Sequence, residues 1–197
     1  MSATLNGYGL RPVYSNGHLT QSRRIDSGIA NSYSTSLYKY QPVAINSSGQ
    51  IAAASAAADF IGVFMGVAYF DASGVFHELN QWIASTAYDT AKPMYAWVLD
   101  DPNQIYQIQA DGALASSVGG QVDFTTATIG SANSSVVGFS VATANASSLS
   151  TSAQKQLRIM ELASTPAMNG TNAWGDAYTE VRVQIARHQY VFNKVAV

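Results

Sequence analysis

Three acidic side chains lie within one short stretch, AWVLDDPNQIYQIQADG (96–112), in a chain of which only 11% of residues are charged. Two carboxylates across a cleft could hydrolyse a glycosidic bond, and several together could hold a metal ion. The spacing of Asp100, Asp101 and Asp111 does not fit a calcium loop of the form D-x-[DN]-x-[DN]-G with a distant glutamate. Because aspartate is favoured in turns, where its carboxylate accepts backbone N–H bonds, we predict that all three acids cap turns.

Motifs for other reactions are missing from the sequence. His77-Glu78 is not followed by the second histidine of a zinc-protease helix, and there is no nucleophile elbow, phosphate-binding loop or dinucleotide fingerprint. With no cysteine, the chain has no disulfide, thiolate metal site or thiol nucleophile. We therefore predict a non-enzymatic protein with no catalytic residue, no metal and no cofactor. A hydrolytic pair of acids remains an alternative, with candidates Glu78, Asp100, Glu161, Asp176 and Glu180.

Composition indicates a protein that assembles with other proteins. The net charge is −2 and the isoelectric point about 5.8, which argues against a nucleic-acid partner because phosphate binding needs a basic face. The charged fraction is less than half of the roughly 25% of typical soluble domains, so little charge must be desolvated when another protein covers the surface. No apolar run approaches the roughly 18 residues of a membrane span, and the first residues lack a leader pattern, so we expect no membrane partner and synthesis in the cytoplasm.

Turn residues between apolar runs predict β-hairpins along much of the chain. The stretch DFIGVFMGVAYFDASGVFHELNQW (59–82) has two such runs around the turn 71–74, and the turn 46–49 separates Val43 to Ile45 from Ile51. In TEVRVQI (179–185), apolar and polar residues alternate, which predicts a strand with one buried face. KQLRIMEL (155–162) predicts another strand whose buried face is ambiguous.

The acidic stretch itself fits two strands and two turns. We predict strands over 94–99 and 104–109, with turns over 100–103 and 110–112. The alanine-rich segment 52–58 has helix propensity without an apolar stripe, so a strand or loop of small residues is an equal alternative. The segment 117–154 is rich in Ser, Thr and Gly, which would suit a mobile linker. Because apolar residues recur in it every few positions, we instead predict strands of small side chains packed in an assembly.

The first 24 residues predict an extended N-terminal arm. Gly7, Gly9, Pro12 and Gly17 discourage regular structure, while apolar residues between them could contact a neighbouring protein. The alternative is an edge strand on the protein's own sheet. Residues 25–197 would then form a single β-rich domain.

The order and spacing of several stretches resemble a family of virion structural proteins of tailed bacteriophages, similar to capsid cement, or head decoration, proteins. The stretches are GYGLRPVYSNGH (7–18), SGIANSYSTSLYKYQPVAINSSG (27–49), DFIGVFMGVAYFDASG (59–74), YAWVLDDPNQIYQIQADG (95–112) and NAWGDAYTEVRVQIARHQYVFNKVAV (172–197). The resemblance implies an all-β fold, a β-sandwich or jelly-roll-like barrel, with no catalytic residues. It also implies many copies on the exterior of the virion capsid, bound to a major capsid protein of the HK97 type.

We expect a homodimer or homotrimer, since closed symmetry favours small oligomers. The candidate interface residues come from the two ends of the chain: Leu10, Arg11, Val13, Tyr14, Arg23, Arg24, Arg187, His188, Tyr190 and Phe192. The alternative function is a carbohydrate-recognition module or other structural protein of the phage tail or head, with Trp82 or Trp97 as an exposed aromatic side chain that stacks on a sugar.

Overall fold

The structure, a computed structural model, describes residues 5–15, 20–132, 137–163 and 172–191, and in these residues the chain is all-β. The strands are β1 (Arg11–Ser15), β2 (Arg23–Ile25), β3 (Leu37–Tyr38), β4 (Pro42–Ile45), β5 (Ile51–Ala53), β6 (Gly62–Phe70), β7 (Phe76–Leu79), β8 (Gln81–Trp82), β9 (Tyr95–Leu99), β10 (Gln104–Gln109), β11 (Gln121–Val122), β12 (Leu157–Leu162) and β13 (Glu180–Ile185). A single 3₁₀ turn, η1, covers Ala146–Ser148 in the described chain. No helix of the described residues is long and apolar enough to cross a bilayer.

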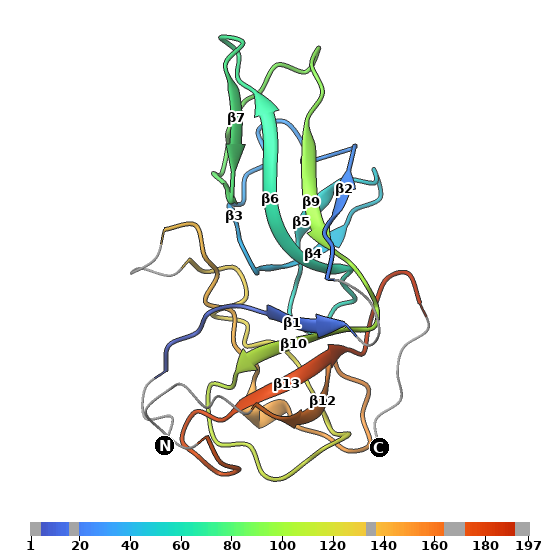
Figure 1. Ribbon diagram of the computed structural model, residues 1–197, viewed down its shortest axis with the longest axis vertical. Helices are drawn as coiled ribbons and strands as arrows, with labels where there is room; N and C mark the ends of the chain where they lie inside the picture. The colour runs from blue at the N-terminus through green and yellow to red at the C-terminus, as the bar shows by residue number, and fades with distance from the viewer. Residues whose placement is uncertain (1–4, 16–19, 133–136, 164–171, 192–197) are drawn as a thin grey trace.

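Two antiparallel sheets make up the body of the molecule (Figure 1). The upper sheet has the order β2-β9-β6-β4-β5, with β7 also paired to β6, and the lower sheet has the order β1-β10-β13-β12-β11. Strands β3 and β8 form a separate two-stranded ribbon. The upper strands run along the long axis of the molecule and the lower strands run across it, as in orthogonally packed sheets. The predicted all-β, sandwich-like class is confirmed.

Each sheet comes from a different part of the chain. All strands of the upper sheet lie within 23–99, whereas the lower sheet combines β1 with strands from 104–185. The turn 100–103 carries the chain from β9 of the upper sheet into β10 of the lower sheet. The acidic stretch of the sequence therefore joins the two sheets.

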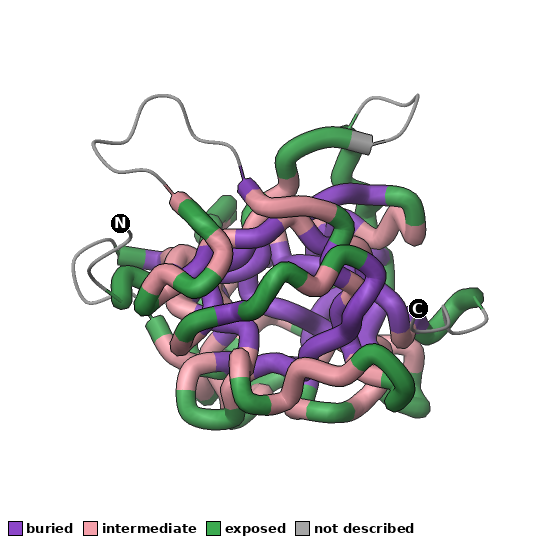
Figure 2. The backbone as a smooth tube through the Cα atoms, turned by 90° about the horizontal axis from the view of Figure 1, so that it is seen from below, coloured by how far each residue is buried: buried purple, intermediate pink, exposed green. Residues whose placement is uncertain are grey.

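Two groups of buried apolar side chains form the core, and buried backbone fills the middle of the molecule (Figure 2). The lower group includes Val181, Val183 and Ile185, which alternate along β13 with half-buried polar residues as predicted. The upper group includes the large side chains of Phe64 and Trp82. Phe60, Val63 and Leu99 from the upper segment pack in the lower group, so the two sheets share a continuous junction.

The predicted hairpins are confirmed. Strands β6 and β7 pair around the turn 71–74, and β4 and β5 pair around 46–49. In each turn a glycine takes a left-handed backbone conformation, Gly74 with φ 83° and Gly49 with φ 76°, that other residues rarely adopt. Strand β10 has the predicted bounds, and β12 carries a register shift between Ile159 and Glu161, which explains its mixed polarity.

Both ambiguous segments are irregular structure packed on the protein's own core. Residues 52–58 finish β5 and continue as a loop, without a helix. Among the described residues of 117–154, only β11 and η1 are regular, but Phe124, Ala142 and Ala144 are buried, and isolated bridges hold the segment to its neighbours. The described part is therefore mostly irregular structure packed on this chain's core, neither a linker nor a set of regular strands.

The described part of the N-terminal segment lies on the protein's own sheets, with β1 in the lower sheet and Arg23 and Arg24 of β2 in the upper sheet. β1 pairs antiparallel with β10, which is the edge-strand alternative. Leu10 is fully buried, and its N–H donates to the carbonyl of Tyr40 at 2.9 Å. Leu10 is consequently a core residue of this chain and is not available to a partner.

Candidate interaction surface

The three acids of the opening stretch take separate roles. Asp101 caps its turn as predicted, because its Oδ1 accepts the N–H of Asn103 at 2.8 Å. Asp111 instead joins distant loops, accepting the N–H of Ala146 at 2.8 Å and the hydroxyl of Thr125 at 2.7 Å. The six-residue strand β10, about 20 Å long, separates Asp111 from the other two acids, so the three form no common site.

Asp100 contacts both the N-terminal and the C-terminal segment of the described chain. Its carboxylate binds the guanidinium of Arg23 at 2.6 Å, and Arg23 also donates to the hydroxyl of Tyr190 at 3.2 Å. The Asp100 hydrogen bond is the main reason that the pKa of Arg23 is raised. The ring nitrogen Nε2 of His188 lies 3.1 Å from the Asp100 carbonyl, and Nδ1 accepts the N–H of Tyr190 at 3.1 Å. Arg23 and Tyr190, from opposite ends of the sequence, therefore share one cluster.

A second cluster covers the outer face of the lower sheet. The side chain of Tyr14 reaches across the sheet, where its hydroxyl donates to Glu161 at 3.0 Å. The guanidinium of Arg182 lies 5.6 Å from the centre of the Tyr14 ring and binds Glu161 at 2.8 Å. These hydrogen bonds, that of Arg182 first, lower the pKa of Glu161 below its usual value. Tyr14 is therefore held in one orientation although much of it is exposed.

Gln104 connects the two clusters. This fully buried side chain donates to the carbonyl of Tyr14 at 2.8 Å, and its oxygen accepts the hydroxyl of Thr20 at 3.1 Å. Gln104 directly follows the turn that begins at Asp100. The end of β1, this turn and the segment around Tyr190 consequently lie next to one another (Figure 1).

We define the contact surface as Val13, Tyr14, Arg23, Tyr190 and Val191, the exposed residues of β1 and of the segments joined by the Arg23–Tyr190 hydrogen bond. The four apolar or aromatic members are 38 to 51% exposed, so each offers a large area to a partner. The hydroxyls of both tyrosines are hydrogen-bonded within the chain, which fixes their rings before any partner arrives.

The other sequence candidates lie elsewhere or are buried. Arg24 stacks over Tyr95 at 4.4 Å on the upper sheet, and Arg187 binds Asp59 at 2.7 Å. Arg11 is exposed on β1, next to Gln107 of β10. His188 is only 2% exposed, so it supports Tyr190 from beneath and does not itself present a surface. Phe192 lies outside the described residues.

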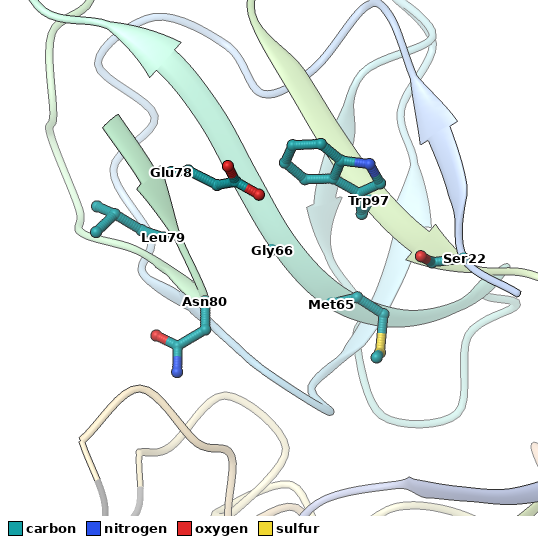
Figure 3. A pocket seen from close by; sticks show the side chains of 7 residues that line it. All are labelled: Ser22, Met65, Gly66, Glu78, Leu79, Asn80 and Trp97. Atoms are coloured by element: carbon teal, nitrogen blue, oxygen red, sulfur yellow. The ribbon is translucent and has the colours of Figure 1, made fainter. Parts of the chain in front are cut away.

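A groove on the outer face of the upper sheet was not predicted as a site. It has a volume of about 560 Å³ and is lined by Ser22, Met65, Gly66, Glu78, Leu79, Asn80 and Trp97 (Figure 3). The strand sequence YAWVL could have pointed to this groove. Ala96 and Val98 are buried, so alternation along the strand places Trp97 on the opposite, outer face. Of the two tryptophans considered for sugar stacking, Trp82 is wrong, since it is 1% exposed within the upper core.

Four of the hydrolytic acid candidates are engaged in hydrogen bonds or ion pairs within the chain. Glu161 is paired with Arg182, Asp100 with Arg23, and Glu180 accepts hydrogen bonds from Tyr8 and Gln107. Asp176 accepts the N–H of Ala173. Across residues 5–15, 20–132, 137–163 and 172–191, no three His, Asp or Glu side chains are grouped so that they could hold a metal ion.

Comparisons with protein-family models, curated proteins and solved structures find no match to this chain. The function must therefore be argued from the chain's own sequence, composition and geometry.

Proposed function

We propose that this protein is a capsid cement protein of a tailed bacteriophage, a non-enzymatic component that binds the exterior of the icosahedral shell and bridges subunits of the major capsid protein. The proposal rests on the sequence resemblance to phage structural proteins, on the low charge of the chain and on the contact surface. The observation that carries it is the hydrogen bond between Arg23 and Tyr190, which joins the N-terminal and C-terminal segments at that surface.

The contact surface has the properties of a protein-binding site. Its exposed aromatic and arginine side chains are the types that are enriched at the centres of interfaces. Because Tyr14 and Tyr190 are already fixed by hydrogen bonds to Glu161 and Arg23, docking immobilises few rotamers. A pre-ordered surface of this kind loses less entropy on binding than flexible side chains would.

Repetition on a shell removes the need for high affinity at each contact. A protein held by several shell subunits, or by its own symmetry mates in a dimer or trimer, gains from effective concentration at every further contact. With only 11% charged residues, the chain also has few charges to desolvate where it lies against the shell. Small contacts of low charge thus suffice to strengthen a shell at many sites.

The first experiment is to measure how many copies of this chain accompany each major capsid protein in purified virions, by quantitative mass spectrometry. We expect about one copy per shell subunit, or a simple fraction set by a symmetry axis. Absence of the chain from the particles would overturn the proposal, and a few copies per particle would assign the protein to the tail instead.

A binding experiment then tests the surface. Shells lacking the protein are mixed with the purified wild type or with Tyr14→Ala/Tyr190→Ala, and bound protein is measured after sedimentation. We expect the double variant to lose at least about tenfold in affinity, because two interface aromatics are removed. The matched control is Phe76→Ala, which truncates an equally exposed aromatic on the β6–β7 hairpin and should bind normally. Equal binding by the double variant would exclude this surface.

A further inference from the structure

The groove on the outer face of the upper sheet has a floor without side chains. Gly66 of β6 lies at its centre, between β7 on one side and β9 on the other (Figure 3). A Cβ atom at Gly66 would stand 2.9 Å from the carbonyl oxygen of Leu79, closer than real side chains approach. The register shift between Phe64 and Gly66 sets this residue on the outer face, so the sheet itself hollows the groove.

Trp97 forms one wall of the groove. It pairs with Gly66 in the ladder, and its ring lies over the face of the sheet with one side toward the groove. Opposite a glycine, an indole ring has no neighbouring side chain to cover that side. The half-buried Trp97 therefore offers a flat aromatic surface that is fixed by the sheet below it.

Three polar side chains lie around the Trp97 ring, and they make no side-chain hydrogen bond within the described chain. The side chain of Glu78 extends over β6 toward Trp97, while Ser22 and Asn80 lie at the two edges (Figure 3). None of these three side chains hydrogen-bonds to, or forms an ion pair with, a described residue. A ligand in the groove could therefore use them without displacing an internal bond.

We propose that the groove binds a neutral sugar residue of a glycan, with one face of the pyranose ring on Trp97 and its hydroxyls donating to Glu78. The faces of aromatic rings are electronegative, which favours the weakly positive C–H groups of a sugar face. A carboxylate accepts two or more hydroxyl hydrogen bonds, and its charge disfavours acidic sugars. The groove sets one aromatic surface beside several polar side chains, which suits a ligand with an apolar face and many hydroxyls.

The lining also favours a sugar over other ligands. A cationic head group such as a methylated amine is usually held by several aromatic rings, but Trp97 is the one aromatic residue lining this groove. Glycoside hydrolysis needs two carboxylates, and Glu78 is the only acid in the lining. The groove therefore binds the sugar without cleaving it.

Titrations of the purified full-length protein test this inference, with the Trp97 indole N–H signal followed by NMR. The probes are maltohexaose, cellohexaose, laminarihexaose, mannohexaose and chitohexaose. We expect at least one to shift the Trp97 signal saturably below about 10 mM, with little dependence on salt because the ligand is uncharged.

Substitutions locate the site. Trp97→Ala should weaken binding of that probe, measured by calorimetry, by at least about tenfold, and Trp97→Phe should restore part of it because the flat ring remains. Glu78→Gln should weaken binding several-fold with normal thermal unfolding. The control Tyr178→Ala removes another half-buried aromatic side chain, outside the groove, and should bind the sugar like the wild type.

Three results would overturn the inference: no shift with any of the five probes, undiminished binding by Trp97→Ala, or competition by tetramethylammonium in a salt-dependent manner. The last result would identify a cation site instead. The inference does not rest on the virion proposal, since sugar binding is measured on the isolated protein and copy number on particles.

Discussion

Gln156 holds an exposed loop against the lower core, and its substitution gives a sharp test of the fold. The fully buried side chain accepts the N–H groups of Ala57 at 2.8 Å and Phe124 at 3.2 Å. It donates to the carbonyls of Ser55 at 2.9 Å and Ala58 at 2.7 Å. One amide thus supplies four hydrogen bonds to two segments far apart in the sequence.

The cost of Gln156→Ala follows from these four bonds. Each contributes about 1 kcal/mol net, so their loss would cost about 4 kcal/mol if every partner stayed unpaired. Water can reach part of the loop 55–58, but it cannot reach the buried N–H of Phe124. We expect the free energy of unfolding to fall by about 3 kcal/mol, which lowers Tm by roughly 6 to 12 °C in a protein of this size.

The substitution Gln156→Glu keeps the shape of the side chain and replaces only the NH₂ group that donates the two hydrogen bonds. An oxygen would replace the nitrogen that faces the carbonyls of Ser55 and Ala58, so burial and repulsion would raise the pKa of the new carboxyl above its unfolded value of about 4.3. The folded state then binds more protons than the unfolded state, and stability falls as pH rises from the unfolded pKa to the folded pKa. The deficit relative to wild type should be large at pH 7 and should shrink as pH falls toward 4.3.

Urea unfolding of wild type and both variants, followed by far-UV circular dichroism from pH 4 to 8, measures these differences. Gln50→Ala is the matched control, because the Gln50 side chain makes no hydrogen bond to a described residue, and it should change stability by less than about 0.5 kcal/mol. A Gln156→Ala variant within that range, or a Gln156→Glu deficit independent of pH, would refute the reasoning.

Two further predictions follow from the packing and charge of the lower sheet and its junction. Gly62→Ala places a Cβ 1.9 Å from the carbonyl oxygen of Leu99, so we expect a loss above about 3 kcal/mol by urea unfolding, whereas Gly130→Ala, with no atom within 4 Å, should be nearly neutral. Because Arg182 lowers the folded pKa of Glu161, that pair contributes stability above the unfolded pKa and loses it as pH falls through the folded pKa. The exposed pair is screened, so Glu161→Gln should cost about 0.5 kcal/mol at pH 7 and nothing at pH 2, and an equal cost at both would contradict the assignment.

Local turn chemistry explains which parts of the fold could be predicted from sequence. The hairpins around 46–49 and 71–74 depend on a glycine and a few polar residues within one turn, and strand β13 depends on its own alternation. Such signals need no knowledge of the rest of the chain. The turn of Asp101 belongs to the same class.

The candidate surfaces depend on contacts between distant residues, which the sequence could not supply. Tyr14 and Glu161 are 147 residues apart, and Arg23 and Tyr190 are 167 apart. The groove could not be predicted because β6 is apolar on both faces. Its register shift, which the sequence does not reveal, decides which face Gly66 occupies. Leu10 was misjudged because the carbonyl that accepts its N–H belongs to Tyr40, 30 residues away in a turn with no pattern of its own.

The division of the chain between the two sheets implies an order of folding during synthesis. Every strand of the upper sheet has emerged from the ribosome once residue 99 has passed the exit tunnel, so this sheet can form while the rest is still being made. β10 pairs with β1 along one edge and with β13 along the other. The second edge stays unpaired until β13, which ends at Ile185, has been synthesised. For most of the synthesis of the second half, β1 and β10 have an open edge toward other nascent chains. We expect slow maturation of the lower sheet and a need for chaperones at high expression, since long-range strand pairing folds slowly.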